Sequence, residues 1–365
     1  MKMCQAFADA GHEVALSGWA NPGNGADPVA FNGLRGGFRV RLTPLGPAFD
    51  NPFARRLQVT GASLAVKTRQ LIEEMAPDLV YSRLTVGELL CVPRRIPIIY
   101  EMHSLRPLRG GVIERTAFKI LVRRKTVRRI VSTTEALKVS LETELPDVEV
   151  VVARLSAEPP LAIPADQLRA FRERHLQGRQ FAWHVGYTGQ LDTTGLRGTQ
   201  VICDVAAEMP DVAFHVVGGE PAVVVDWRQH ARRAGGHGNI FFYGYHPPPE
   251  MPLFLGCFDV VLAPLQYRPS RRAPQGQGMS PLKIAQYLSY GKAIVASEVP
   301  AHRELMRDAE TARLVDPADV DAWVRAIRLL LDNDALRETM GGAGRAFYDA
   351  ELTPDRRVKT VLAGL

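Results

Sequence analysis

The stretch that decides the fold is MSPLKIAQYLSYGKAIVAS, residues 279–297. The hydroxyl of Ser280 can cap a helix by accepting from backbone N–H groups that have no other partner. Pro281 suits the first helical position, where no donor is needed. Gly291 ends the predicted helix, and residues 293–296 then read as a short buried strand. The stretch therefore predicts a polar loop, a helix and a strand in succession.

The predicted helix combines an apolar face with a misplaced cation. Leu282, Ala285 and Leu288 recur at helical spacing, so we expect them to face a core. Lys283 lies in the first turn, where the positive end of the helix dipole disfavours a cation unless an anion is bound nearby. The pattern indicates a phosphate site, and the alternative is an ordinary helix–strand unit with a solvated lysine.

The same stretch resembles the donor-binding segment of family 4 glycosyltransferases, which are retaining enzymes of the GT-B architecture. The residues that carry the resemblance are Ser280-Pro281-Leu282-Lys283, Tyr287, Gly291-Lys292 and Ile294-Val295-Ala296-Ser297. Related motifs extend over nearly the whole chain and are strongest from Trp183 to Val315.

The resemblance and the pattern of elements predict the same fold class. Strands and helices alternate along the chain, which is typical of doubly wound parallel α/β sheets. We expect an α/β protein of the GT-B type, with two Rossmann-like domains facing a central cleft. The predicted domains are residues 1–160 on the acceptor side and 161–345 on the nucleotide-sugar side. A C-terminal helix in 346–365 is expected to cross back to the first domain.

The beginning of the chain departs from the family pattern. Ala10-Gly11-His12-Glu13-Val14 resembles the end of the first helix and the second strand of such N-terminal domains. The strand and Gly-rich loop that precede this helix in the family are absent. We expect a truncated start, and the alternative is a first sheet that lacks a central strand.

Several glycine turns are expected to hold the donor. Gly186 and Gly189 follow a predicted strand, and glycine lets a backbone approach a phosphate closely. Gln190 stands where relatives have an arginine, and the resemblance implies that Arg197 replaces the family's lysine on the diphosphate. The donor-contacting residues implied by the resemblance are Gly189, Gln190, Gly219, Glu220, Tyr245, His246, Ser280, Leu282 and Gln286, of which Tyr245 and His246 would face the base.

The expected catalytic groups are His103, Lys283 and Arg197. A departing diphosphate must be stabilised, and preorganised cations and N–H groups usually contribute most to such catalysis. His103 follows a predicted strand, and the resemblance implies contact with the transferred sugar. Its alternative role is that of a turn residue at a strand end. The acceptor is expected on the first domain, near Arg83 and His103.

Gln286 is the main departure within the donor segment. In many relatives a glutamate at this position grips the ribose of the sugar nucleotide. A glutamine can still donate to and accept from a diol, but without charge assistance. We therefore expect weaker ribose binding than in relatives that carry the glutamate.

No metal or bound cofactor is predicted, and the nucleotide diphosphate sugar is expected as a substrate. Asp319 and Asp321 form an acid-x-acid pattern, which in another glycosyltransferase architecture binds a metal. Here the pattern directly precedes an amphipathic helix, so helix capping is the better interpretation.

The 365 residues are 46% hydrophobic and 23% charged, with a net charge of +6. These values are typical of globular proteins, and no apolar run approaches the length needed to span a bilayer. The four cysteines have no paired spacing, which favours a reducing cytoplasm.

Residues 106–129 carry nine basic residues against Glu114. This segment predicts peripheral contact with anionic lipid at the inner face of a membrane, and the alternative is a solvated helix. No nucleic-acid-binding module accompanies the charge.

Two other functions remain compatible with the sequence. A non-catalytic relative would bind a sugar nucleotide without turnover, and the altered donor contacts favour it. A GT-B epimerase would share the donor site but need no acceptor, and the Ser280–Lys283 segment disfavours it. The sugar, the base, the acceptor and the oligomeric state are not encoded in a readable motif.

Overall fold

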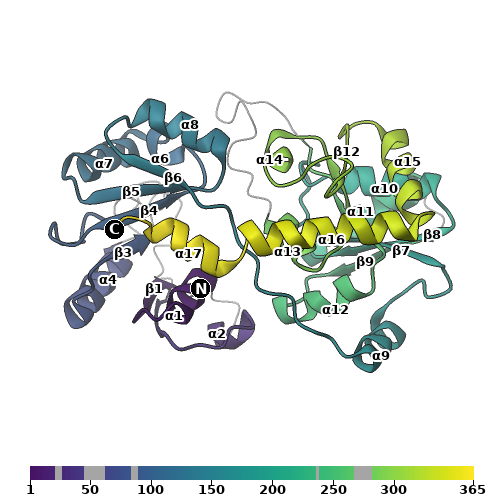
Figure 1. Cartoon of the computed structure of the whole chain (residues 1–365), viewed down its shortest axis with the longest axis horizontal. Helices are drawn as coiled ribbons and strands as arrows, with labels where there is room; N and C mark the ends of the chain where they lie inside the picture. Colours follow the sequence, from purple (N-terminus) through teal and green to yellow (C-terminus); the bar gives the residue numbers. More distant parts are fainter. Residues whose placement is uncertain (21–26, 45–61, 84–88, 236–237, 267–281) are drawn as a thin grey trace. The chain divides into compact units, whose positions relative to one another are not determined.

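The computed structural model describes residues 1–20, 27–44, 62–83, 89–235, 238–266 and 282–365 (Figure 1). The chain divides into two compact units. Unit 1 contains the described residues of Met1–Arg154 together with Pro354–Leu365. Unit 2 contains the described residues of Leu155–Ser270 and Pro281–Thr353. The end of the chain thus groups with its beginning.

Unit 2 is built on one parallel sheet of six strands. Its strands are β7 (Trp183–Thr188), β8 (Val212–Val217), β9 (Ile240–Gly244), β10 (Val260–Ala263), β11 (Ala293–Ser297) and β12 (Arg313–Val315). Their order across the sheet is β9-β8-β7-β10-β11-β12. The direction of winding therefore reverses between β7 and β10, where doubly wound sheets bind ligands at the carboxyl ends of their strands.

Helices cover both faces of this sheet. They are α9 (Ala165–His175), α10 (Thr199–Glu208), α11 (Pro221–Arg233), α12 (Met251–Gly256), α13 (Leu282–Ser289), α14 (Pro300–Arg303), α15 (Val320–Leu331) and α16 (Asp334–Glu351), with a short 3-10 turn at Pro248–Glu250. Val260 and Leu262 of β10 belong to a core with α10, α11 and α15. Val261 and Ala263 belong to the opposite core with α12, α13 and α16. Successive strand residues thus face opposite layers, so β10 has no polar face.

Unit 1 contains two separate parallel sheets among its described strands. The larger sheet has the order β3 (Val80–Ser82), β4 (Ile98–Met102), β5 (Val127–Ser132) and β6 (Glu149–Val152). The smaller one pairs β1 (Ala15–Trp19) with β2 (Arg39–Thr43). The helices are α1 (Lys2–Asp9), α2 (Pro28–Phe31), α4 (Ala62–Met75), α6 (Arg106–Arg109), α7 (Val112–Arg123), α8 (Glu135–Glu144) and α17 (Pro354–Leu362).

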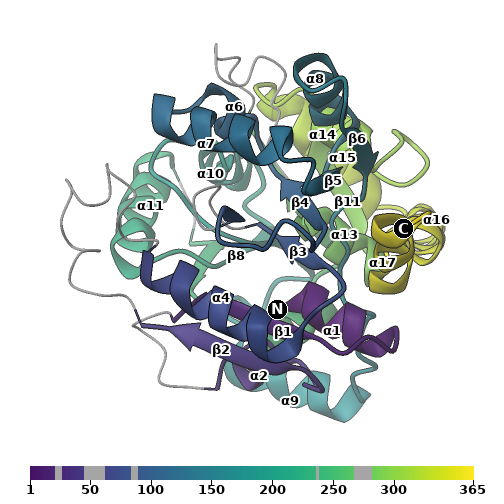
Figure 2. The ribbon, with the colours of Figure 1, turned by 90° about the vertical axis from the view of Figure 1, so that its left-hand side faces the viewer.

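The larger sheet of unit 1 is also covered on both faces. Ile98 and Tyr100 pack in a core with Phe118 of α7 and Leu137 of α8. Ile99 packs on the other side with Val361 of α17 and Phe7 of α1. Figure 2 shows α1 and α17 close to one another beside β3, with α7 and α8 on the other side of the sheet. The C-terminal helix therefore completes the fold of unit 1.

Two expectations need correction. Ala285 and Leu288 are fully buried as predicted, but Leu282 is 41% exposed because it begins the helix. The basic segment 106–129 is not one surface, since β5 begins at Val127 and the Arg129 side chain is buried. Helix α11 was not predicted.

Candidate functional site

Glycine backbone forms the edge of the unit 2 sheet where three strands end. Gly189 follows β7, Gly218 follows β8, and Gly244 ends β9. The N–H of Gly189 donates to Val217 O at 2.9 Å, and the N–H of Gly218 donates to Gly244 O at 2.7 Å. Their φ angles are 147°, 128° and 77°, a region that side chains rarely adopt. The chain thus presents bare backbone at the carboxyl edge of the sheet.

Glycine is required at position 186 for packing, and not for the close approach of a phosphate that we expected. It lies within β7, and a Cβ at this position would overlap the Phe258 ring. Gly218 is similarly constrained, since a Cβ there would overlap the carbonyl oxygen of Gly189. Gly186 therefore serves packing inside the unit, while Gly189 and Gly218 shape the edge.

Tyr287 holds helix α13 against the end of β7. Its hydroxyl accepts a hydrogen bond from Thr188 N–H at 2.8 Å. Burial raises the pKa of Tyr287 to about 12, so the hydroxyl stays neutral. The hydrogen bond thus joins α13, the helix that follows β10 along the chain, to the end of β7, and the winding reverses between these two strands. It fixes where the other α13 side chains lie, including Lys283 and Gln286.

Lys283 is directed at the glycine edge. Its Nζ lies 3.6 Å from the centroid of the Tyr187 ring. A Cβ on Gly189 would stand 2.9 Å from the same nitrogen. Tyr187 is fully buried, and its hydroxyl donates to the carbonyl of Gln190 at 2.9 Å. The ring therefore supports the ammonium on one side, with the Gly189 turn beside it.

The electrostatics around Lys283 favour an anion. Burial holds the pKa of Lys283 well below its ordinary value, and the charge of Arg197 lowers the pKa further. Within the described residues, no carboxylate forms an ion pair with Lys283. Arg197 lies 3.9 Å from Asp192, measured from Nε to Oδ2, which is a loose ion pair. Lys283 and Arg197 thus share one site, and among the described residues only Asp192 forms an ion pair with either of them.

The other predicted donor residues lie along the same carboxyl edge of the sheet or at the start of α13. Gln190 and Glu220 are exposed, Gly219 is buried beneath Leu191, and Gln286 is half-buried. Tyr245 is 58% exposed directly after β9, and His246 Nδ1 lies 2.7 Å from Glu250 Oε2. Leu282 is exposed at the first position of α13. Ser280 lies outside the described residues.

His103 belongs to unit 1, where it directly follows β4 as predicted. Its Nε2 makes a short contact with Oε1 of Glu101, a carboxylate that is almost fully buried. Arg83 Nε lies 3.5 Å from the same oxygen. His103 is half-buried, so its ring remains accessible beside a fixed carboxylate.

The acid-x-acid pattern serves a helix, as predicted. Asp319 is the N-cap of α15, and its Oδ1 accepts from Ala322 N–H at 2.9 Å. Across the described ranges, no group of three His, Cys, Asp or Glu side chains is arranged to hold a metal ion. No helix in those ranges is both long enough and apolar enough to cross a bilayer.

The sequence analysis did not predict the residues that hold the site side chains in place. Tyr187 was not singled out, although a buried aromatic just before a glycine turn could have indicated a platform for a cation. Tyr287 was quoted for resemblance only, without its hydrogen bond to Thr188. Arg357 was also missed, because nothing in the local sequence connects the last helix with Glu101.

Comparison with known proteins identifies the activity. Residues 183–333, which contain β7 to α15, match the family described as "Glycosyl transferases group 1". The chain is 25% identical to D-inositol 3-phosphate glycosyltransferase of Corynebacterium glutamicum over 77% of this chain and 70% of that protein. It is 26% identical to phosphatidyl-myo-inositol mannosyltransferase of Mycobacterium tuberculosis over 93% of this chain and 82% of that protein. The chain is a glycosyltransferase.

Solved structures show the fold of this glycosyltransferase. HepE of Anabaena, in complex with UDP and glucose, superposes with a TM-score of 0.72 at 16% identity and covers 100% of this chain and 94% of its own. Sucrose-phosphate synthase of Thermosynechococcus elongatus gives a TM-score of 0.72 at 17% identity, covering 98% and 89%. The predicted α/β GT-B fold is confirmed.

Proposed function

We propose that this glycosyltransferase moves a sugar from a nucleotide diphosphate sugar to an acceptor hydroxyl, with retention of configuration and without a metal. The observation that carries the proposal is the pair of cations, Lys283 and Arg197, beside the Gly189 turn at the reversal of winding. A diphosphate would supply the negative charge that neither cation finds in a close carboxylate of the described ranges. Structures of HepE hold UDP and UDP-glucose, which supports the donor class.

The residues have distinct roles in the proposed transfer. Lys283 and Arg197 hold the diphosphate and stabilise its charge as it departs, which is how preorganised cations act in catalysis. The backbone at Gly189 and Gly219 allows close approach of the phosphates. Tyr245 and His246 contact the base, and Gln286 contacts the ribose. His103 contacts the transferred sugar from unit 1.

The test is a panel of UDP-, GDP-, ADP- and dTDP-sugars, monitored for release of nucleoside diphosphate. Inositol 3-phosphate and phosphatidylinositol are the first acceptors to supply, because two relatives are named for such acceptors. Turnover should persist in excess EDTA, and proton NMR should show the anomeric configuration of the donor in the product. An inverted product or loss of turnover in EDTA would contradict the corresponding part of the proposal.

A non-catalytic sugar-nucleotide-binding protein is the second candidate. Gln190 and Gln286 favour it, since both replace charged residues that relatives use on the donor. Tight binding of a sugar nucleotide without diphosphate release for any acceptor would select this candidate. A GT-B epimerase would instead convert the donor sugar without an acceptor, and the same panel would show it as a new sugar nucleotide.

We further propose that α7 docks on anionic lipid. Its exposed face carries three basic residues one turn apart, Arg115, Lys119 and Arg123. Val112 and Ile120 lie among them and are 68% and 40% exposed. No carboxylate of the described chain forms an ion pair with these three basic residues. Cations interleaved with exposed apolar side chains suit a surface of negatively charged headgroups over acyl chains.

A further inference from the structure

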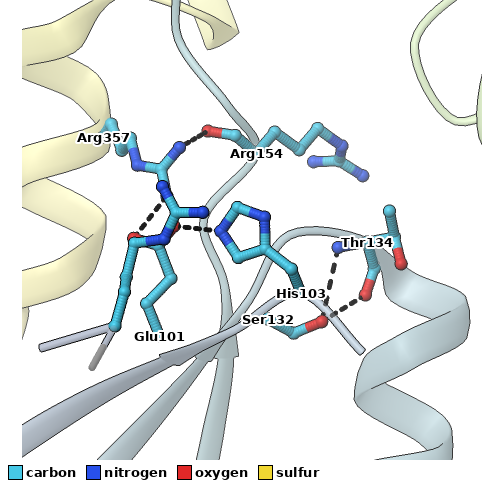
Figure 3. Close-up of polar contacts among 7 residues, drawn as sticks. Glu101, His103, Ser132, Thr134, Arg154 and Arg357 are labelled. Carbon is cyan, nitrogen blue, oxygen red and sulfur yellow. Dashed lines mark hydrogen bonds and ion pairs between the residues drawn. The ribbon is translucent and has the colours of Figure 1, made fainter. Parts of the chain in front are cut away.

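The Glu101 carboxylate is buried in the middle of unit 1. It lies on β4, every residue of which is buried, and its side chain is 1% exposed. An ionised carboxylate in such a place must be paired, because burying an isolated charge is very unfavourable. Figure 3 shows two of the groups that meet it, His103 from the turn after β4 and Arg357 from helix α17.

Arg357 of α17 supplies the buried cation. Its Nη2 lies 3.0 Å from Glu101 Oε2 as an ion pair, and its Nη1 donates to Arg154 O at 3.1 Å (Figure 3). The Arg357 side chain is only 3% exposed. Burial lowers the pKa of this guanidinium, and the Glu101 charge opposes that effect. Arg83, the other cation near Glu101, is 60% exposed and lies 3.5 Å from Oε1.

The Glu101 carboxylate also determines the state of the His103 ring. An ionised carboxylate only accepts hydrogen bonds, so the His103 nitrogen that faces it must donate. That nitrogen is Nε2. In the neutral ring, Nδ1 is then the free acceptor. A carboxylate that turned away would no longer impose this form.

Helix α17 is attached to unit 1 by contacts other than that of Arg357 with Glu101. Arg129 of β5, which is also buried, donates to Val361 O at 2.7 Å and to Ala363 O at 2.6 Å. It also pairs with Glu149 at 2.9 Å. Buried ion pairs are weak evidence for stability, because apolar residues of similar volume often stabilise a fold equally well. The pair of Arg357 with Glu101 therefore calls for a reason other than anchoring.

We propose that Arg357 is a positioning residue for His103. It holds the Glu101 carboxylate in place, and Glu101 in turn fixes the orientation and the Nε2–H form of the His103 ring. The C-terminal helix thereby contributes to the reactive side of unit 1. The catalytic consequence rests on the proposed contact of His103 with the transferred sugar, whereas the effect on the ring does not.

The experiment compares five proteins: the wild type, Arg357→Met, Arg357→Lys, the double variant Glu101→Gln/Arg357→Met, and the matched control Arg129→Met. Nitrogen-15 NMR of the His103 ring reports its tautomer, and thermal unfolding reports stability. Steady-state kinetics separates kcat from the KM of the donor. Arg357→Lys tests whether a cation alone rescues Arg357→Met.

We expect the wild type to show the Nε2–H form, and Arg357→Met and the double variant to show a mixture. In these two variants kcat should fall by about tenfold or more, as for loss of an oriented catalytic group, with KM nearly unchanged. The double variant should regain most of the stability lost in Arg357→Met, because no unpaired charge remains, but not kcat. Arg357→Lys should recover part of kcat, and Arg129→Met should lose stability while keeping kcat and the ring form.

The proposal is overturned if the His103 ring keeps the wild-type tautomer in Arg357→Met, or if kcat follows stability equally in all variants, including Arg129→Met. A wild type without turnover would contradict the proposed function instead. The NMR comparison would then still decide whether Arg357 positions His103.

Discussion

The ammonium of Lys283 lies 3.6 Å from the centroid of the Tyr187 ring, with the bare backbone of Gly189 beside it. The two residues come from opposite sides of the point at which the unit 2 sheet reverses its winding. A lysine held there by an aromatic ring is preorganised, so little side-chain entropy remains to be lost when an anion binds. This relationship leads to the first prediction.

Binding of a nucleoside diphosphate should be accompanied by proton uptake. Burial and Arg197 lower the pKa of Lys283 in the free protein, and a bound diphosphate would raise it again. Between these two pKa values the complex holds more protons than the free protein, so affinity should fall as pH rises through that window. Calorimetry in buffers of different ionisation enthalpy measures the uptake. Lys283→Met should abolish it, and an unchanged uptake in this variant would refute the assignment to Lys283.

His302 should make unit 2 less stable in acid. Burial lowers the pKa of His302 to about 4, although its hydrogen bond to Ser297 O opposes this effect. The unfolded chain takes up a proton near pH 6.5, whereas the folded chain does not, so stability is present above pH 6.5 and is lost as pH falls toward 4. The loss is on the order of 3 kcal/mol, because a tenfold difference in proton affinity between the two states corresponds to about 1.4 kcal/mol.

The measurement is urea unfolding between pH 7 and pH 4. His302→Asn can still donate to Ser297 O and has no titrating ring, so its dependence on pH should be flatter than that of the wild type. His215, whose pKa burial lowers to about 3, should contribute a remaining slope in both proteins. Equal slopes in the two proteins would show that His302 does not carry the effect.

Gln286→Glu should tighten binding of a matched sugar nucleotide. Gln286 lies one turn beyond Lys283 on α13 and is half-buried. A carboxylate would accept from the ribose hydroxyls with charge assistance, and the difference between charged and neutral hydrogen bonds is about 1 kcal/mol. Calorimetry with the donor compares the two proteins. No detectable binding by either protein would favour a site that no longer accepts a donor.

Reversing charge on α7 should release the protein from anionic vesicles. Each basic residue near such a surface contributes about 1 kcal/mol, so Arg115→Glu/Lys119→Glu should weaken binding by at least about 2 kcal/mol. Sedimentation with anionic and neutral vesicles at low salt measures this. The matched control is Arg169→Glu/Arg174→Glu, which changes the charge equally on the exposed face of α9. Equal loss in both variants would point to net charge rather than to α7.

The sequence predicted features that depend on local pattern. Residues 293–296 read as a buried strand because they are continuously apolar, and they lie in β11. Asp319 was interpreted as a cap because an amphipathic helix follows it. The prediction that Leu282 faces a core was wrong, because helical periodicity does not account for the helix end, where the first turn is open to solvent. The basic segment was extended too far, because the charges of Arg128 and Arg129 continue the basic pattern although both residues lie in β5.

Features that join distant segments could not be predicted. Arg129 was counted as a surface charge, but it pairs with Glu149 and holds the end of α17. Likewise the partners Glu101 and Arg357 are brought together only by the fold. A charged side chain has no periodicity that reveals its burial, since burial depends on a partner elsewhere in the chain.

The most direct test of the central claim is calorimetric binding of nucleoside diphosphates to the wild type, Lys283→Ala, Arg197→Ala and the control Lys292→Ala. Lys292 is a half-buried lysine of the same unit whose ammonium already donates to Phe258 O at 2.7 Å. If Lys283 and Arg197 hold the diphosphate, each change to Ala should weaken binding by about 1.5–3 kcal/mol, the range for hydrogen bonds to charged groups. Lys292→Ala should lower stability and leave affinity unchanged. Wild-type affinity in both Lys283→Ala and Arg197→Ala would contradict the account.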